Sequence, residues 1–531
     1  MTKSFRLGPL IGAASALLAV TLTAPTSAAN ATEAASITAP TTATVTTSQA
    51  IGAVNSEPSM EPIPLKSRGE FLVQFRNRDD RPMRKILAEA GVSLSRNQMS
   101  ALRGPVFNGT RADISRQQAR ILREAGAIKA VERIQTFSVQ KTPQPTLQTQ
   151  EATSLWNLDR INQRQLPLDG MYNPFDDGAA TNIYIVDSGV NDIPGQFVGR
   201  YGDSAYVAEV AANSSDCEGH GTHVAGTAAS TSYGAAKGAT IHSVRVLNCA
   251  GEGNTATILA GLNWVAENAK PPAIVNLSLG GPKSAINNSA VQQLDQLGIL
   301  TVAAAGNEAV NACATSPASA PDTLTVSASN QSDAVPTFSN FGSCVDVFAP
   351  GTDITSLSLL GPPIQLSGTS MAAPAATGVA AVLWEANPLA TPAQIREVIV
   401  GSATSGALQL TNAQSNSPNL LLYVDSQKPS LSVPSKVKKL KAKDIKKSQV
   451  KTKWKQPKNN GGIEITKYKA RIKQKGKNYK SWKKKSAKSG KTSYDKKWKN
   501  LKSGKKYVVQ VAAKNAVGVG KTKKVTFRTK S

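Results

Sequence analysis

From residue 182 onward, short apolar runs rich in β-branched residues alternate with segments of helical composition. The clearest apolar runs cover residues 182–187, 244–247, 273–279 and 300–305. The clearest helical segments cover residues 258–267, 289–297 and 392–400. This alternation is the signature of βαβ units, in which helices cover both faces of a parallel sheet. The sequence therefore predicts an α/β domain in this central region.

One serine is placed where such a fold concentrates backbone N–H groups. Ser370 follows Gly368 and Thr369 and precedes a run of small residues, strongly helical in composition, that reaches Trp384. The first N–H groups of a helix and the positive end of its dipole both favour negative charge on a nearby oxygen. A serine at a helix start is most often only an N-cap. Interpreting Ser370 as a nucleophile therefore requires partners elsewhere in the chain.

Two upstream segments supply such partners. Asp187 ends an apolar run, at the carboxyl end of a predicted strand, where open α/β sheets place their sites; a turn aspartate before Gly189 is the alternative. His220 stands at the start of a predicted helix. Because His223 follows three residues later, a metal pair is the alternative, although no third ligand is evident. The order Asp187, His220, Ser370 is one of the known orders of a catalytic triad.

These motifs resemble those of the subtilisin-like serine peptidases, in particular the proteinase K and aqualysin branch. The matching segments are 187–189 (DSG), 220–226 (HGTHVAG), 304–307 (AAGN) and 368–374 (GTSMAAP). The resemblance covers residues 150–425 and implies that Asp187, His220 and Ser370 form the triad. It also implies that the Asn307 amide and the Ser370 N–H stabilise the oxyanion. A simple loop asparagine is the alternative for Asn307.

The chemistry of acyl transfer requires these residue types. A serine hydroxyl is a weak nucleophile at neutral pH, so a histidine must remove its proton and later deliver that proton to the leaving amine. An aspartate holds the imidazole in the correct tautomer and stabilises the imidazolium.

The resemblance extends to substrate binding. It implies that two segments pair with the substrate backbone as added strands and that small residues open the pocket for the residue before the cut; the residues are Gly251, Gly253, Ser278, Leu279, Gly280, Ala304 and Gly306. Because main-chain recognition tolerates many sequences, we expect broad endopeptidase specificity.

Four cysteines can pair in three ways in an exported protein. The resemblance selects Cys217 with Cys249 and Cys313 with Cys344. It also implies one structural Ca²⁺ site, formed by the loop 316–321 and a downstream aspartate, and no catalytic cofactor. Its ligands would be the carbonyl oxygens of Pro321 and Thr323 and the carboxylate of Asp346, hard donors suited to Ca²⁺. A turn role is the alternative for Asp346.

The composition of the N-terminal region indicates that the protein is exported. Residues 1–29 have a basic start, an apolar stretch at 8–22 and small residues suited to cleavage, so they are interpreted as a signal peptide. A membrane anchor is the alternative. Residues 30–68 are rich in Ala, Thr and Ser and are interpreted as a flexible spacer. We expect a secreted, extracellular protein, which argues against four reduced cytosolic thiols.

Residues 69–148 are interpreted as a small α+β unit with strands at 70–75 and 130–134 and helices at 84–90 and 116–125. The order resembles the inhibitor-type prodomain of the family, which would cap the enzyme and leave its C-terminal arm in the cleft. An unrelated α+β module is the alternative. The resemblance places the cut near Gln148–Gln150 and the peptidase domain at 149–425.

The C-terminal region differs sharply in charge. After a linker at 426–434, residues 435–531 have the strand-and-turn spacing of an all-β domain that resembles a fibronectin type III sandwich. From Lys428 to Ser531 there are 34 Lys and 2 Arg against 3 acidic residues, a net formal charge of +33, whereas the rest of the chain carries −6 of the total of +27. We expect this domain to bind polyanions, such as cell-wall polymers, acidic lipids, acidic substrates or, least favoured, nucleic acid. A solvated face that keeps the domain soluble is the alternative.

Together these features predict a secreted, monomeric serine endopeptidase of broad specificity, made as a self-processing precursor that its own prodomain inhibits. An esterase is disfavoured because no G-x-S-x-G motif surrounds Ser370. An inactive adhesion protein is disfavoured because the triad residues and Asn307 are all present.

Overall fold

The computed structural model describes residues 68–76, 80–94, 102–139, 155–359, 361–427, 432–461, 465–487, 491–515 and 517–531. They all fall within one compact unit, Ile63–Ser531. The predicted signal peptide, almost all of the predicted spacer and the predicted cut near Gln148–Gln150 lie outside the described residues.

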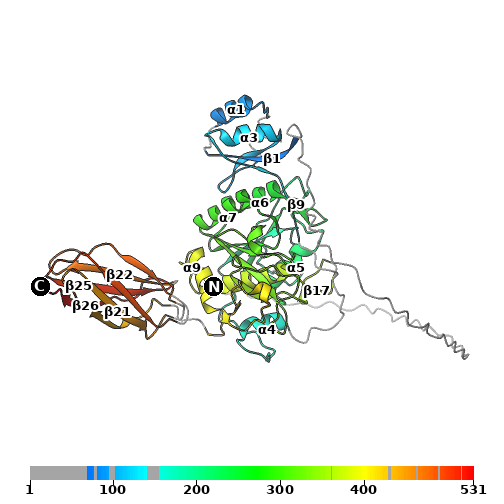
Figure 1. The fold of residues 1–531 in the computed structure, drawn as a ribbon. Helices are drawn as coiled ribbons and strands as arrows, with labels where there is room; N and C mark the ends of the chain where they lie inside the picture. The colour runs from blue at the N-terminus through cyan, green and yellow to red at the C-terminus, as the bar shows by residue number, and fades with distance from the viewer. Residues whose placement is uncertain are drawn as a thin grey trace, which may run out of the picture. The chain divides into compact units, whose positions relative to one another are not determined.

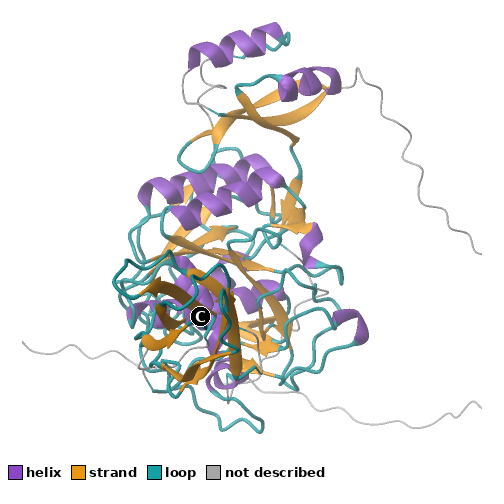
Figure 2. Ribbon diagram, turned by 60° about the vertical axis from the view of Figure 1, so that its left-hand side comes forward, coloured by secondary structure: helices purple, strands orange, loops and turns teal. Residues whose placement is uncertain are grey.

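The first part of the described chain is a small α+β domain. Its strands are β1 (Arg68–Phe75), β2 (Leu102–Arg103), β3 (Asn108–Ser115) and β4 (Ile128–Arg133), and its helices are α1 (Asp80–Glu89) and α3 (Arg116–Glu124). The strands form a sheet in the order β2-β3-β1-β4, and both helices lie on one side of it (Figure 2). The two strands and two helices predicted for this region are confirmed.

A sheet of nine strands forms the centre of the next domain, in the order β18-β19-β15-β14-β12-β10-β6-β8-β7. The six central strands, from β15 to β8, pair in parallel throughout. The bounds are β6 (Asn182–Asp187), β7 (Ala205–Tyr206), β8 (Thr240–Arg245), β10 (Ala273–Leu277), β12 (Ile299–Ala304), β14 (Thr323–Ser329), β15 (Val347–Pro350), β18 (Thr404–Ser405) and β19 (Leu420–Leu421). The predicted parallel α/β fold is confirmed.

Helices cover both faces of this sheet (Figure 1). Alternate residues of β6 separate the two cores: Ile183 and Ile185 pack with the helices of one face, Tyr184 and Val186 with those of the other. The first face carries α5 (His220–Ala229), α8 (Thr369–Glu385) and α9 (Pro392–Ser402), and the second carries α6 (Thr255–Asn268) and α7 (Ala285–Gln296).

Shorter elements complete this domain. They are α4 (Trp156–Asn162), β9 (Glu252–Asn254), β11 (Gly281–Pro282), β13 (Thr315–Ser316), β16 (Ile354–Ser356), β17 (Ile364–Leu366) and the 3₁₀ turns Ala312–Ala314 and Asn412–Gln414. A further strand, β5 (Thr136–Ser138), follows the small domain and pairs with β9.

The C-terminal region forms two antiparallel sheets, as predicted. One has the order β20-β21-β24 and the other β23-β22-β25-β26. The bounds are β20 (Val437–Lys443), β21 (Val450–Pro457), β22 (Lys467–Gln474), β23 (Lys483–Ser486), β24 (Ser493–Trp498), β25 (Lys506–Lys514) and β26 (Lys523–Arg528). The rings of Trp454, Tyr468 and Tyr494 pack together in the core between them.

Candidate active site

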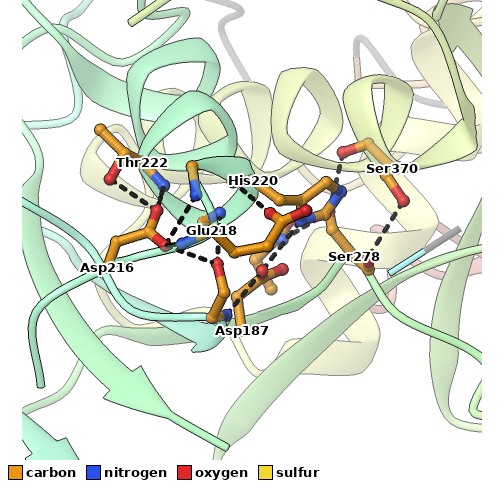
Figure 3. A network of polar contacts seen from close by, with 11 residues as sticks. Asp187, Asp216, Glu218, His220, Thr222, Ser278 and Ser370 are labelled. Atoms are coloured by element: carbon orange, nitrogen blue, oxygen red, sulfur yellow. Dashed lines mark hydrogen bonds and ion pairs between the residues drawn. The ribbon is translucent and has the colours of Figure 1, made fainter. Parts of the chain in front are cut away.

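The end of β6 and the start of α5 bring an acid and a base together. The Asp187 carboxylate is fully buried, and its Oδ1 lies 2.8 Å from Nδ1 of His220 (Figure 3). The same oxygen accepts the Ser188 N–H at 2.7 Å. Helix α5 approaches the end of β6 so closely that a Cβ on Gly221 would lie 2.0 Å from the Gly189 carbonyl oxygen. The two motif glycines therefore permit the contact between Asp187 and His220.

The surroundings of His220 raise its pKa. Burial by itself lowers the pKa, but the charge and hydrogen bond of Asp187 outweigh burial, and the charges of Glu218 and Asp216 add to the increase. The imidazolium formed when His220 accepts a proton is therefore stabilised by three carboxylates.

Ser370 lies in the first turn of α8, as predicted. Its hydroxyl donates to the Ser278 carbonyl at 2.9 Å, and the Ser278 hydroxyl donates to the Ser370 carbonyl at 2.8 Å (Figure 3). The buried His220 Nε2 has no hydrogen-bond partner among the described residues. The Ser370 hydroxyl is therefore held by Ser278, whereas the imidazole nitrogen of His220 is left without a protein partner in this part of the chain.

Asn307 lies beside the same turn. Its side-chain oxygen accepts the Thr369 N–H at 2.9 Å and the Thr369 hydroxyl at 2.8 Å. These bonds fix the amide so that its nitrogen lies 3.0 Å from the position that a Cβ on Gly368 would occupy. The structure thus holds the amide nitrogen next to the N-terminus of α8, where the sequence predicted an oxyanion donor.

Asp216 is a site residue that the sequence analysis missed. Its buried carboxylate accepts from the N–H groups of Glu218, Gly219 and Thr222 and from the hydroxyls of Ser188 and Thr222, all within 2.8–3.0 Å. It thereby fastens the turn that leads into His220 to the turn after β6. Its only signal in the sequence is an acidic residue just before a helix start.

The predicted substrate-binding segments flank a strand from the chain itself. β5 pairs antiparallel with β9, with Phe137 opposite Gly253. Val139 donates its N–H to the Gly251 carbonyl at 2.9 Å. On the other side, Ser138 and Gly280 exchange two backbone bonds of 3.2 Å. Residues 136–139 therefore lie as a middle strand between the two predicted segments.

Side chains from this middle strand are buried against the catalytic domain. Phe137 and Val139 belong to the same apolar cluster as Leu279. The two small residues predicted to open a pocket lie at the end of β12 and just after it: Ala304 is buried, and the Gly306 N–H donates to the Thr369 hydroxyl at 3.1 Å. Ser278 and Gly306 are thus brought to the N-terminus of α8, beside Ser370 and Thr369.

Both predicted disulfides are present. Cys217–Cys249 and Cys313–Cys344 have S–S distances of 2.09 and 2.03 Å. The first bridge joins the turn before His220 to the turn before Gly251, so it links His220 to a predicted substrate-binding segment.

Among the predicted calcium ligands, Asp346 has a half-buried side chain. Asp346 accepts the Thr325 N–H at 2.9 Å, and burial raises its pKa to about 6. Thr323 begins the same strand, and Pro321 precedes it by two residues. Among the described residues no group of three or more His, Cys, Asp or Glu side chains could hold a metal.

A second set of oxygens was not singled out from the sequence. Asp159 is buried, and burial raises its pKa, with nearby Asp169 adding to the increase. Asp159 Oδ1 and Gln163 Oε1 are both buried without a hydrogen-bond partner in the described structure. Unpaired buried oxygens of this kind are costly and suit a cation.

Comparisons with known proteins match both large domains. Residues 176–422 match the model of the subtilase family, and residues 435–529 match that of the fibronectin type III domain. The extracellular serine proteinase of Thermus sp. (strain Rt41A) is 39% identical over 343 residues, covering 64% of this chain and 80% of that protein. This chain belongs to the subtilase family.

Two further matches extend the comparison. Alkaline serine exoprotease A of Vibrio alginolyticus is 41% identical over 317 residues, covering 60% of this subtilase and 58% of that relative, so less than two thirds of the relative is matched. A crystal structure of a cold adapted subtilisin-like serine proteinase has 44% identity and a TM-score of 0.49, covering 51% of this chain and 98% of that one. In the described part of this subtilase, no helix has the length and apolar character needed to cross a membrane.

Proposed function

We propose that this subtilase is a secreted serine endopeptidase of broad specificity in which Asp187, His220 and Ser370 form the catalytic triad. The observation that carries the proposal is the 2.8 Å contact between His220 and a fully buried Asp187, close to a serine at the N-terminus of α8. The names of its extracellular serine protease relatives support the same activity and location.

The proposed reaction is acyl transfer through a serine ester. The Ser370 hydroxyl leaves its bond to the Ser278 carbonyl, gives its proton to His220 Nε2, and attacks the substrate carbonyl carbon. The Asn307 amide nitrogen and the Ser370 N–H stabilise the oxyanion. His220 then protonates the leaving amine, and water hydrolyses the ester by the same steps in reverse.

The small N-terminal domain is proposed to inhibit the precursor. Residues 136–139 take the position expected for a substrate strand between β9 and Gly280. The domain is also bound to α6, where the buried Asn263 side chain accepts the N–H groups of Val106 and Phe107 at 3.1 and 3.0 Å. A segment bound in this way excludes other substrates until the chain is cut and the domain dissociates.

Replacing Ser370 tests both the activity and self-processing. The Ser370→Ala chain, made without other proteases, should lose hydrolysis of a casein substrate by about 10⁴-fold or more and remain uncut. N-terminal sequencing of the wild-type product tests the predicted cut near Gln148–Gln150. Maturation of the Ser370→Ala chain would exclude self-processing. It would not contradict the proposed peptidase activity, which the casein assay tests separately.

Structural calcium is proposed to bind at two positions in this chain. Asp346, with carbonyls of Pro321 and Thr323, offers hard donors, and Asp159 with Gln163 has unpaired buried oxygens. A bound Ca²⁺ would stabilise the native state by mass action. Removing it with EDTA should shorten the inactivation half-life at elevated temperature more than it lowers the initial rate. An unchanged half-life would remove calcium from the proposal.

The Lys-rich C-terminal domain is proposed to attach the enzyme to polyanions such as those of cell walls. The net formal charge of +33 between Lys428 and Ser531 supports this role. A mature protein ending at Asp425 should cleave a short soluble peptide normally but lose retention on an anionic matrix at low salt. Equal retention of the two forms would argue for a domain that is merely solvated.

A further inference from the structure

The three-stranded sheet of the C-terminal domain has one face made almost entirely of lysines. Its inward residues, such as Val450, Thr452 and Trp454, are buried, and the residues between them point outward. We call the outward set the outer lysine face; its members are Lys438, Lys441 and Lys443 of β20, Lys451, Lys453 and Lys455 of β21, and Lys497 of β24. All three strands of the sheet contribute lysines to this face.

The strand register places these lysines directly opposite one another. Lys441 is paired with Lys453, Lys443 with Lys451, and Lys451 in turn with Lys497. Like charges at opposed positions destabilise a sheet. Folding therefore works against charge repulsion across the whole face, and an external polymer of opposite charge would relieve it.

Acidic side chains of the described residues neutralise little of the positive charge of the outer lysine face. Asp495, on β24, is an acidic residue among these rows, and it forms an ion pair with Lys451 at 3.6 Å. Within the described residues no other lysine of the outer lysine face has an acidic side chain at ion-pair distance. The positive charge of the face is thus directed to solvent.

The outward face of the four-stranded sheet is different. Its central cation, Arg471, lies 4.4 Å from the ring of Tyr479 and 4.3 Å from that of Trp482, and donates to Gln510 at 2.8 Å. Uncharged Gln510 and Ala512 stand between its remaining lysines. This face also has opposed lysines, Lys467 with Lys514 and Lys469 with Lys484, but its centre is already engaged by groups of the domain itself.

We propose that the outer lysine face is the polyanion-binding surface of this protein and that it takes a linear polymer with one oxyanion on each repeating unit. This inference rests on the proposed attachment function of the domain and assigns it to one face. Lysines two residues apart on a strand are spaced by about 7 Å, and neighbouring strands by about 5 Å. Such a flat grid of point charges matches repeated charge along an extended chain rather than one multivalent anion.

A pair of variants with equal charge tests the assignment. The first replaces four residues of the outer lysine face (Lys441→Gln, Lys453→Gln, Lys455→Gln and Lys497→Gln). The control replaces four outward lysines of the other sheet (Lys467→Gln, Lys469→Gln, Lys484→Gln and Lys514→Gln). Both are made in the full mature protein, and affinities for polyphosphate and for polygalacturonate are measured as a function of salt. The polymer that binds more tightly identifies phosphate or carboxylate as the preferred oxyanion.

The first variant should lose at least about 10-fold in affinity at low salt, and its slope of log affinity against log salt should flatten by about 0.7–0.9 for each lost contact. The control should lose less than about 3-fold. Because removing opposed like charges relieves repulsion, the first variant should not melt at a lower temperature than wild type. Equal losses in the two variants would overturn the assignment yet leave polyanion binding intact, whereas no binding by the wild type would overturn both.

Discussion

The Glu218 carboxylate accepts the backbone N–H of His220 at 2.8 Å. Glu218 lies two residues before His220. Burial lowers the pKa of His220, but the charge and hydrogen bond of Asp187 raise it, and the negative charge of Glu218 adds to the increase. One side chain thus both orients the first turn of α5 and acts on the protonation of the base at the centre of the site.

We predict that Glu218→Gln shifts the acidic limb of the pH profile of kcat/KM to lower pH. General base catalysis needs neutral His220, and a raised pKa keeps the imidazole protonated up to a higher pH. Removing the Glu218 charge lowers that pKa, so the neutral form persists at lower pH. The control is Asp192→Asn, which removes the same charge from an exposed position. A limb that moves to higher pH would contradict the electrostatic role.

Replacing Asn307 should lower kcat by about 10²–10³ with little change in KM. Asn307→Ala loses the amide donor but also the oxygen that holds Thr369. Asn307→Asp retains the acceptor for Thr369 but loses the donor and adds a negative charge beside the oxyanion, so its loss of rate does not arise from the bonds to Thr369. Both variants should be slow in steady-state assays on a peptide ester or amide. Near-normal kcat in Asn307→Asp would mean that the amide nitrogen does not stabilise the oxyanion.

Local sequence signals were sufficient to place the main chain elements and to position Asp187, His220 and Ser370 within them. Asp187 ends an apolar strand, and His220 and Ser370 lie at helix starts, so each is marked by residues within a few positions of it. The family resemblance then connected them, because their meeting depends on strands far apart in the sequence.

Contacts that depend on the packing of distant segments could not be predicted. Asn263 meets Val106 across 157 residues, and Arg160 meets Asp333 across 173. The register of β5 against β9 is equally long-range. No periodicity specifies such pairs, because each partner looks like an ordinary polar or strand residue until the elements are packed.

Asn263→Ala should weaken the hold of the N-terminal domain after processing. The variant removes one acceptor for two N–H groups and a donor bond of 3.1 Å to the Phe107 carbonyl, all at buried positions. Unpaired buried groups of this kind cost about 1–3 kcal/mol each, so the processed complex should dissociate at about 10- to 100-fold higher concentration. The dissociation is measured as the recovery of peptidase activity when the processed complex is diluted. Asn268→Ala, at an exposed position on the same helix, is the control and should behave as wild type.

Asp333→Ala should destabilise the catalytic domain strongly. The Arg160 guanidinium is fully buried and forms two bonds to Asp333, of 2.7 and 2.9 Å, so the variant leaves a buried charge without its partner. Breaking a buried pair in this way costs about 3–5 kcal/mol. Both proteins are made in the Ser370→Ala background, where self-digestion is absent. Denaturant unfolding with and without Asp333→Ala then gives the difference in the free energy of unfolding. Asp203→Ala breaks an ion pair whose side chains are 62% and 58% exposed and should change the midpoint little, because solvent screens that pair. Similar losses of stability in Asp333→Ala and Asp203→Ala would show that the burial of Arg160 does not determine how much stability is lost.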